Sequence, residues 1–287
     1  MRDNVGACTE VFPITPSLDH IIIVVEDLDR AASAYEAFGF FVTPKSVHPF
    51  GTANRLVVFQ NNFIELLAVD DPVMLGAYSV VPDFLEANGG SGAWGLIWET
   101  DQIAKVHAGL DPIGLSASTF QSRIERDIVL PGGKREIACF SSFALMSGLT
   151  STYLEGFSYQ HNRAALFVDE WQAHPNGAEN IICTRLIGPS ECFPIGRWRS
   201  LFGQYLHVEE DEMKLDDEVG VIEVKPTHAS QTSPAQGLAI SEIVIGVRNP
   251  DKSSAAFDGI DDMRSGPCIS ERAKPDLGIS LSFTELI

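Results

Sequence analysis

Two ionisable side chains lie inside strongly apolar segments near the N-terminus. His20 occurs in the run at residues 18–25, and Glu65 occurs in the run at residues 63–69. Burying an imidazole or a carboxylate without a partner is unfavourable. A divalent metal ion bound between the two segments would be a partner for both, because histidine nitrogens and carboxylate oxygens are common metal ligands. The pair therefore predicts a metal site, and Glu65 could also move a proton if it leaves the metal.

Catalytic zinc and non-haem iron usually have three protein ligands and keep positions open for water or substrate. His161 ends the apolar segment 157–161 and is our first choice for the third ligand. Glu155 is the alternative, and His174 would serve if the chain folds back over the site. We assign no role to three further histidines that are expected in loops or at strand edges: His48, His207 and His228.

Other side chains could bind a substrate near this metal. Asn54 follows Gly51 in a turn and could form a hydrogen bond with a carbonyl group. Arg55 or Arg126 could hold a carboxylate through two parallel hydrogen bonds. Aromatic residues on the predicted strands are candidates for the walls of a binding cavity: Trp94, Trp98, Phe157 and Tyr159.

The elements that must position these residues can be predicted from hydrophobic periodicity. Residues 18–25 form an apolar strand, and a helix is expected from Leu28 to Phe38 with Asp27 as its N-cap. Residues 55–59 and 63–69 form a hairpin. Side chains alternate along a strand, so His20, Ile22 and Val24 share one face. By the same alternation Phe63, Glu65 and Leu67 share one face of the last strand.

This order of elements recurs along the chain. It returns at residues 93–160 and again from residue 180, and residues 18–25 match residues 240–247 at a constant offset. Asp29 and Tyr35 then correspond to Asp251 and Phe257. The pattern predicts an α+β fold of four βαβββ modules, arranged as two paired-module domains with curved mixed sheets. The expected divisions are an extension (1–16), a first domain (17–165), a linker (166–178) and a second domain (179–287) that lacks a comparable His and Glu cluster.

Composition limits the classes of partner. The chain has 287 residues, 45% of them hydrophobic, and a formal net charge of −19. This acidity argues against binding to nucleic acid or to an anionic membrane, and leaves a small-molecule substrate as the expected partner, with a homodimer as an option. The five cysteines are scattered and form no C-x-x-C motif, so reduced thiols and a cytoplasmic location are expected. We find no signal peptide and no apolar run of transmembrane length.

Five segments together resemble the vicinal oxygen chelate superfamily and, within it, the glyoxalase-like domain group. They are residues 18–28, 51–55, 63–72, 160–161 and 174–178. The resemblance implies paired βαβββ modules, a U-shaped cup and a divalent metal (Zn, Ni, Mn or Fe) that chelates adjacent oxygens of the substrate. It implies that His20 and Glu65 are metal ligands, with His161 as the third. Relatives often carry a histidine at the position of Ala53.

Two functions from different classes follow. The first is a metal-dependent enzyme that acts on a small oxygen-rich substrate by lyase, isomerase or ring-cleaving dioxygenase chemistry. The second is a metal-free protein that binds or sequesters an apolar ligand, as drug-resistance proteins do. A scaffold whose modules serve dimerisation is a third option. Stoichiometric metal in the purified protein would support the enzyme, and absence of metal with tight ligand binding would support the binding protein.

Overall fold

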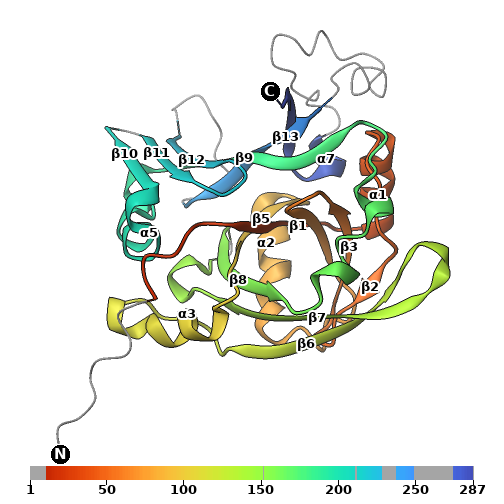
Figure 1. Cartoon of the computed structure of the whole chain (residues 1–287), viewed down its shortest axis with the longest axis horizontal. Coiled ribbons are helices and arrows are strands. Elements are labelled where there is room, and N and C mark those ends of the chain that lie inside the picture. The colour runs from red at the N-terminus through yellow and green to blue at the C-terminus, as the bar shows by residue number, and fades with distance from the viewer. Residues whose placement is uncertain (1–10, 151, 211, 228–236, 249–273, 287) are drawn as a thin grey trace, which may run out of the picture.

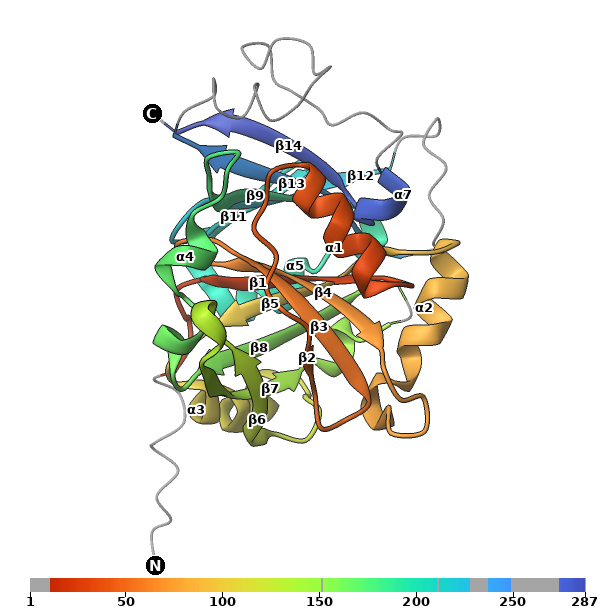
Figure 2. The same ribbon diagram turned by 90° about the vertical axis from the view of Figure 1, so that its right-hand side faces the viewer.

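The structure is a computed structural model that describes residues 11–150, 152–210, 212–227, 237–248 and 274–286. These residues form two curved mixed sheets of eight and six strands, and the smaller sheet lies over the larger (Figures 1 and 2). The α+β fold class predicted from the sequence is confirmed.

The larger sheet contains the first two modules, in the strand order β2-β3-β4-β1-β5-β8-β7-β6. Within each module the first strand pairs in parallel with the last, and β1 and β5 join the modules by antiparallel pairing. Its strands are β1 (Leu18–Val24), β2 (Ser46–Val47), β3 (Thr52–Val58), β4 (Phe63–Val69), β5 (Gly92–Glu99), β6 (Gln121–Val129), β7 (Arg135–Ala144) and β8 (Leu154–Gln160).

This sheet curls until its two edge strands meet. The Ser46 hydroxyl on β2 donates a hydrogen bond of 2.6 Å to the backbone carbonyl of Asp127 on β6. Apolar side chains of β3, including Leu56 and Val58, also pack with Ile128 and Ala138 of β6 and β7. The sheet therefore encloses a space lined by one face of every long strand.

The smaller sheet repeats the same pairing scheme. Its order is β10-β11-β12-β9-β13-β14, with parallel pairs β9·β12 and β13·β14 and an antiparallel junction between β9 and β13. Its strands are β9 (Ala178–Gly188), β10 (Leu206–Glu209), β11 (Glu212–Asp216), β12 (Val221–Pro226), β13 (Ala239–Val247) and β14 (Ser280–Glu285). Asp251 and Phe257, which the internal repeat matched to the first module, lie outside the described residues, as does His228.

Helices cover the edges of the sheets and fill their connections. They are α1 (Leu28–Ala37), α2 (Val80–Asn88), α3 (Ile103–Gly109), α4 (Asp169–Gln172), α5 (Ile195–Phe202) and α7 (Lys274–Leu277). Short 3-10 helices are η1 (Gly76–Ser79), η2 (Asp111–Ile113), η3 (Pro131–Gly133), η4 (Met146–Gly148), η5 (Arg163–Ala165), η6 (Ser190–Cys192) and η7 (Gly203–Tyr205). Asp27 caps α1 as predicted, because its side chain accepts hydrogen bonds from the backbone of Asp29 and Arg30.

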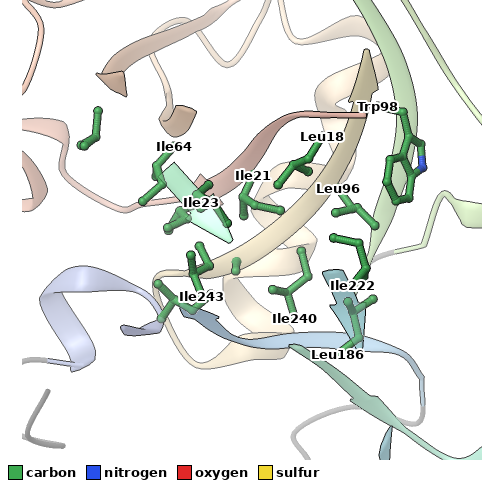
Figure 3. Close-up of a cluster of buried hydrophobic side chains, with 14 of the residues drawn as sticks. Leu18, Ile21, Ile23, Ile64, Leu96, Trp98, Leu186, Ile222, Ile240 and Ile243 are labelled. Atoms are coloured by element: carbon green, nitrogen blue, oxygen red, sulfur yellow. The ribbon is translucent and has the colours of Figure 1, made fainter. Parts of the chain in front are cut away.

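The two sheets share a hydrophobic core. Ile21 and Ile23 of β1 point away from the enclosed space and pack with Leu186, Ile240 and Ile243 of the smaller sheet (Figure 3). Alternation therefore divides this part of β1 between two environments, because Ile21 and Ile23 contact the second sheet whereas His20 and Ile22 line the enclosed space.

The domain boundaries at residues 165 and 179 remain a prediction, as do the homodimer option and the cytoplasmic location. The described residues contain no helix that is long and apolar enough to cross a membrane.

Candidate functional site

A cavity of about 440 Å³ lies inside the curled larger sheet. This volume is within the range of small-molecule binding sites. Much of its wall is apolar, with contributions from Ile22, Leu67, Trp94, Ile97, Phe143 and Leu154. The polar side chains that line it include His20, His48, Asn54, Glu65, Arg126 and Gln160.

The pairing of β1 with β4 brings His20 and Glu65 together. The strands run in parallel with Ile22 opposite Glu65 and His20 opposite Phe63, and these four side chains line the cavity. His20 Nε2 lies 3.4 Å from Glu65 Oε2. The alternation read from the sequence therefore gave the correct face for both side chains.

The His20 ring is held in place from both sides. Its Nδ1 lies 2.8 Å from Asp19 Oδ2, and Gln160 donates a hydrogen bond of 3.1 Å to the same carboxylate oxygen. The ring also stacks on Phe63, with 4.4 Å between the ring centroids. Asp19 can contact its own neighbour because the β1–β5 register is irregular there. Nε2 is thus the nitrogen that faces Glu65.

The surroundings shift the pKa values of His20 and Glu65 in opposite directions. Burial alone lowers the pKa of His20, but the hydrogen bonds and charges of Asp19 and Glu65 outweigh it and raise the pKa to about 9. Burial raises the pKa of Glu65, but His20, His48 and Asn54 outweigh it and lower the pKa to about 2. At neutral pH the pair is an imidazolium and a carboxylate, and each is the buried partner that the other needs.

His48, to which the sequence gave no role, lines the same cavity. It follows β2, and its Nε2 lies 3.7 Å from Glu65 Oε1 and 3.3 Å from Asn54 Nδ2. The amide nitrogen of Asn54 can only donate, so His48 Nε2 accepts and the ring proton lies on Nδ1, 2.9 Å from Thr52 Oγ1. Burial lowers the pKa of His48 to about 4, and it is therefore a neutral imidazole.

Asn54 connects these groups to Arg126. Its amide nitrogen donates to Glu65 Oε1 over 2.5 Å, while its carbonyl oxygen accepts from Arg126 Nη1 over 3.1 Å. Burial lowers the pKa of Arg126 to about 10, although the Glu65 charge raises it in part. Asn54 and Arg126 were both predicted from the sequence to contact substrate, and the structure brings both to the cavity.

The three other candidates for the third metal ligand lie away from the cavity. His161 is exposed after β8 and its Nε2 lies 2.7 Å from Ser141 Oγ. Glu155 is fully buried on the opposite face of β8, where Arg197 pairs with it and the indoles of Trp98 and Trp198 donate to it. His174 bridges the backbones of Phe41 and Val58. Neither His161 nor either alternative therefore joins His20 and Glu65.

The remaining predicted substrate contacts also have other partners. Arg55 forms an ion pair with Asp29 over 2.6 Å and does not line the cavity. Trp98 is buried against the second sheet, and Tyr159 packs against the edge of the shared core. Of the four predicted wall aromatics, Trp94 and Phe157 line the cavity.

Comparison with known proteins agrees with this architecture. The family model of the glyoxalase-like domain matches residues 18–202, which is more than half of the chain. The chain belongs to the glyoxalase-like domain family. The family predicted from the sequence is confirmed, and no curated protein matches the sequence of this glyoxalase-like chain.

Solved structures with the same fold share little sequence with the glyoxalase-like chain. A hypothetical protein from Staphylococcus aureus superposes with a TM-score of 0.67 at 14% identity, covering 95% of this chain and 100% of the other. A mutant of 4-hydroxymandelate synthase from Streptomyces coelicolor gives 0.57 at 10% identity, covering 85% and 74%. A fusion of a xylose isomerase-like TIM barrel with 4-hydroxyphenylpyruvate dioxygenase gives 0.57 at 11% identity, covering 95% and 50%. These identities establish the fold alone.

The donor groups of this site do not fit the metal centre expected for it. Among the described residues, no three His, Cys, Asp or Glu side chains are grouped so that they could hold a metal ion. The Asn54 amide nitrogen donates to Glu65 Oε1 over 2.5 Å, so one oxygen of the carboxylate already accepts a hydrogen bond. His20 lies between the carboxylates of Asp19 and Glu65, at 2.8 Å and 3.4 Å. The unfavourable burial that suggested a metal from the sequence is thus relieved by the side chains themselves.

Proposed function

We propose that this glyoxalase-like chain is an enzyme that transfers protons on a small molecule bound in the cavity, in the manner of an isomerase or lyase. One observation carries the proposal. The Glu65 carboxylate lies between two imidazoles, and the environments of these imidazoles hold one protonated and one neutral at neutral pH. Titratable neighbours whose pKa values are driven apart are the usual arrangement for a general acid and a general base.

The roles follow from the hydrogen bonds. His48 Nε2 is unprotonated and lies 3.3 Å from the Asn54 amide nitrogen. A bound substrate would displace that long contact, and His48 would take a proton from a carbon next to a carbonyl group. The electron pair of that C–H bond would move toward the carbonyl oxygen, which would accept a proton from His20 Nε2. His48 would become an imidazolium and His20 a neutral imidazole, and return of the two protons would restore the enzyme. Glu65 is close enough to stabilise the protonated form of either ring.

The metal-dependent form of this chemistry is not part of the proposal, because the described residues contain no group of three His, Cys, Asp or Glu side chains that could hold a metal ion. The family relationship supports an enzyme but does not choose a reaction, since one fold serves many chemistries.

The test is hydrogen–deuterium exchange of carbonyl compounds in D2O, followed by proton NMR, with a panel of ketones and 2-oxo acids that carry apolar groups. Metal-free wild-type protein should accelerate exchange at the carbon next to the carbonyl. We expect His48→Ala and His20→Gln to reduce the rate by about 100- to 10,000-fold, as for loss of a general acid or base. His207→Gln is the matched control, because His207 is exposed and pairs with Asp216 away from the cavity.

The alternative is a protein that binds a ligand without chemistry, which the mostly apolar wall of the cavity favours. Tight binding of panel compounds with no exchange above the solvent rate would support that alternative and overturn the proposed enzyme. Exchange that appears only after addition of a divalent metal would restore the metal-dependent prediction.

A further inference from the structure

Arg126 is a buried cation in the cavity wall that forms no ion pair with any described residue. It lies on β6, where Ile124, Arg126 and Ile128 face inward while Arg123, Glu125 and Asp127 are exposed. Its residue exposure is 7%. Among the described residues, no carboxylate lies within the 4.0 Å that defines an ion pair with its guanidinium, and its Nε has no hydrogen-bond partner.

Burial of a guanidinium that forms no ion pair is unfavourable. Among the described residues the one side-chain hydrogen bond of Arg126 is to the neutral carbonyl of Asn54, and the Asn54 amide separates its guanidinium from the Glu65 carboxylate. Charged groups in protein interiors are normally paired, and a planar guanidinium matches a carboxylate through two parallel hydrogen bonds. The cavity supplies the space in which such an anion would bind.

We infer that Arg126 anchors the carboxylate of the substrate, and that the substrate is an organic monocarboxylate with an apolar body. One unpaired guanidinium matches one negative charge. The rest of the cavity wall, including Trp94, Phe143 and Leu154, matches a hydrocarbon or aromatic group. This inference deepens the proposed function and rests on the same cavity.

The position of Arg126 also selects the carbon that reacts. The Asn54 amide alone separates the guanidinium from Glu65, with hydrogen bonds of 3.1 Å and 2.5 Å on its two sides. A carboxylate on Arg126 therefore lies beside the acid–base groups, and the carbon next to that carboxylate is the one within their reach. The substrate class is accordingly an acid with an oxygen-bearing or acidic carbon at position 2.

The experiment measures equilibrium binding to the full-length protein by titration calorimetry. The probes are matched pairs of acid and neutral amide: phenylacetate with phenylacetamide, cyclohexylacetate with cyclohexylacetamide, and octanoate with octanamide. Acetate tests the apolar body, and benzylphosphonate tests a dianion. At least one carboxylate should bind about 10- to 100-fold more tightly than its amide, as expected for a charge-assisted hydrogen bond, and more tightly than acetate and benzylphosphonate.

Arg126→Met should remove the preference for the acid over the amide while amide binding remains, which also shows that the variant is folded. Arg123→Met is the matched control, because Arg123 lies on the exposed face of the same strand and pairs with Glu125. The inference would be overturned if acids and amides bound with equal affinity, or if no carboxylate bound at all. It would also be overturned if Arg126→Met kept the preference for acids, or if benzylphosphonate bound more tightly than the carboxylates.

Failure of this inference is distinguishable from failure of the proposed function. His20→Gln should lose proton exchange and still bind carboxylates in preference to amides. Exchange without an Arg126-dependent preference for acids would leave the acid–base proposal standing and remove the carboxylate assignment.

Discussion

The ion pair between His20 and Glu65 should be measurable as a coupling in protein stability. The pKa of Glu65 falls from 4.5 to about 2 in the folded protein, with burial opposing the shift and His20 the largest favourable cause. A shift of this size corresponds to about 3 kcal/mol of preference for the charged form. His48 and Asn54 supply part of it, so a double-mutant cycle with His20→Gln and Glu65→Gln should give a coupling energy of about 2 kcal/mol.

The sign of the pH dependence follows from the two shifts. The pKa of His20 is raised from 6.5 to about 9, so its contribution to stability is complete below pH 6.5 and is lost as pH rises through 9. The pKa of Glu65 is lowered, so its contribution is present above pH 4.5 and is lost as pH falls through 2. The coupling should therefore be largest between pH 4.5 and 6.5.

Urea unfolding followed by tryptophan fluorescence gives the free energy of unfolding for the wild type, both single variants and the double variant. We expect the full coupling near about pH 5.5 and a much smaller one near about pH 9.5. A cycle on the exposed pair Arg123 and Glu125 is the control and should show no coupling at either pH. A coupling of zero at the lower pH, or equal couplings at both, would refute the assignment of a buried imidazolium–carboxylate pair.

Three further changes test the structure around the cavity. Glu155→Gln should lower the free energy of unfolding by about 3 kcal/mol, because it leaves the Arg197 guanidinium unpaired in a buried position; a change below about 1 kcal/mol in urea unfolding speaks against this role. Burial lowers the pKa of His174 to about 4, so on acidification the unfolded chain binds a proton at a higher pH than the folded protein does. The wild type should therefore lose stability as pH falls from 6.5 to about 4, and His174→Ala should remove part of that loss. An unchanged pH profile of stability in the variant contradicts this role. Gly51→Ala should lower the melting temperature by several degrees, because Gly51 has φ +82 and an added Cβ would lie 2.5 Å from the Asp71 carbonyl oxygen; an unchanged temperature contradicts it.

Much of the fold was predictable because local patterns and the internal repeat agree. The apolar strand at residues 18–25, the Asp27 cap and the hairpin ending at residue 69 each specify one element, and repetition of the order specifies the pairing. The elements that these patterns did not predict include β2, α4 and α2. Helix α2 follows the first module, and its Val81 and Phe84 pack against Ile22 and Val24 at the cavity wall.

The choice of face on β8 could not be read from the sequence. The segment is buried on both faces, so apolar alternation does not show which parity points into the cavity. The structure places Leu154, Gly156, Ser158 and Gln160 at the cavity, whereas Glu155 points toward α5 and contacts Trp198. The prediction used the other parity and therefore selected His161.

His48 was missed because its position depends on how far the sheet curls. It lies in the short connection between β2 and β3, which has no periodicity, and reaches the cavity because the connection folds over the end of β3. A usable signal was present in the spacing, since His48 and Asn54 flank the Gly51 turn and must both lie near the start of β3.

The protonation state of His20 tests the central claim most directly. The measurement is nitrogen-15 NMR of the histidine rings in metal-free wild-type protein, with His20→Gln to assign the signals, across the range from about pH 5 to about pH 10. We expect both His20 nitrogens to carry protons at neutral pH, the ring to titrate near pH 9, and one equivalent of zinc to leave its signals unchanged. A neutral His20 ring whose Nε2 signal shifts on binding one equivalent of zinc would contradict it.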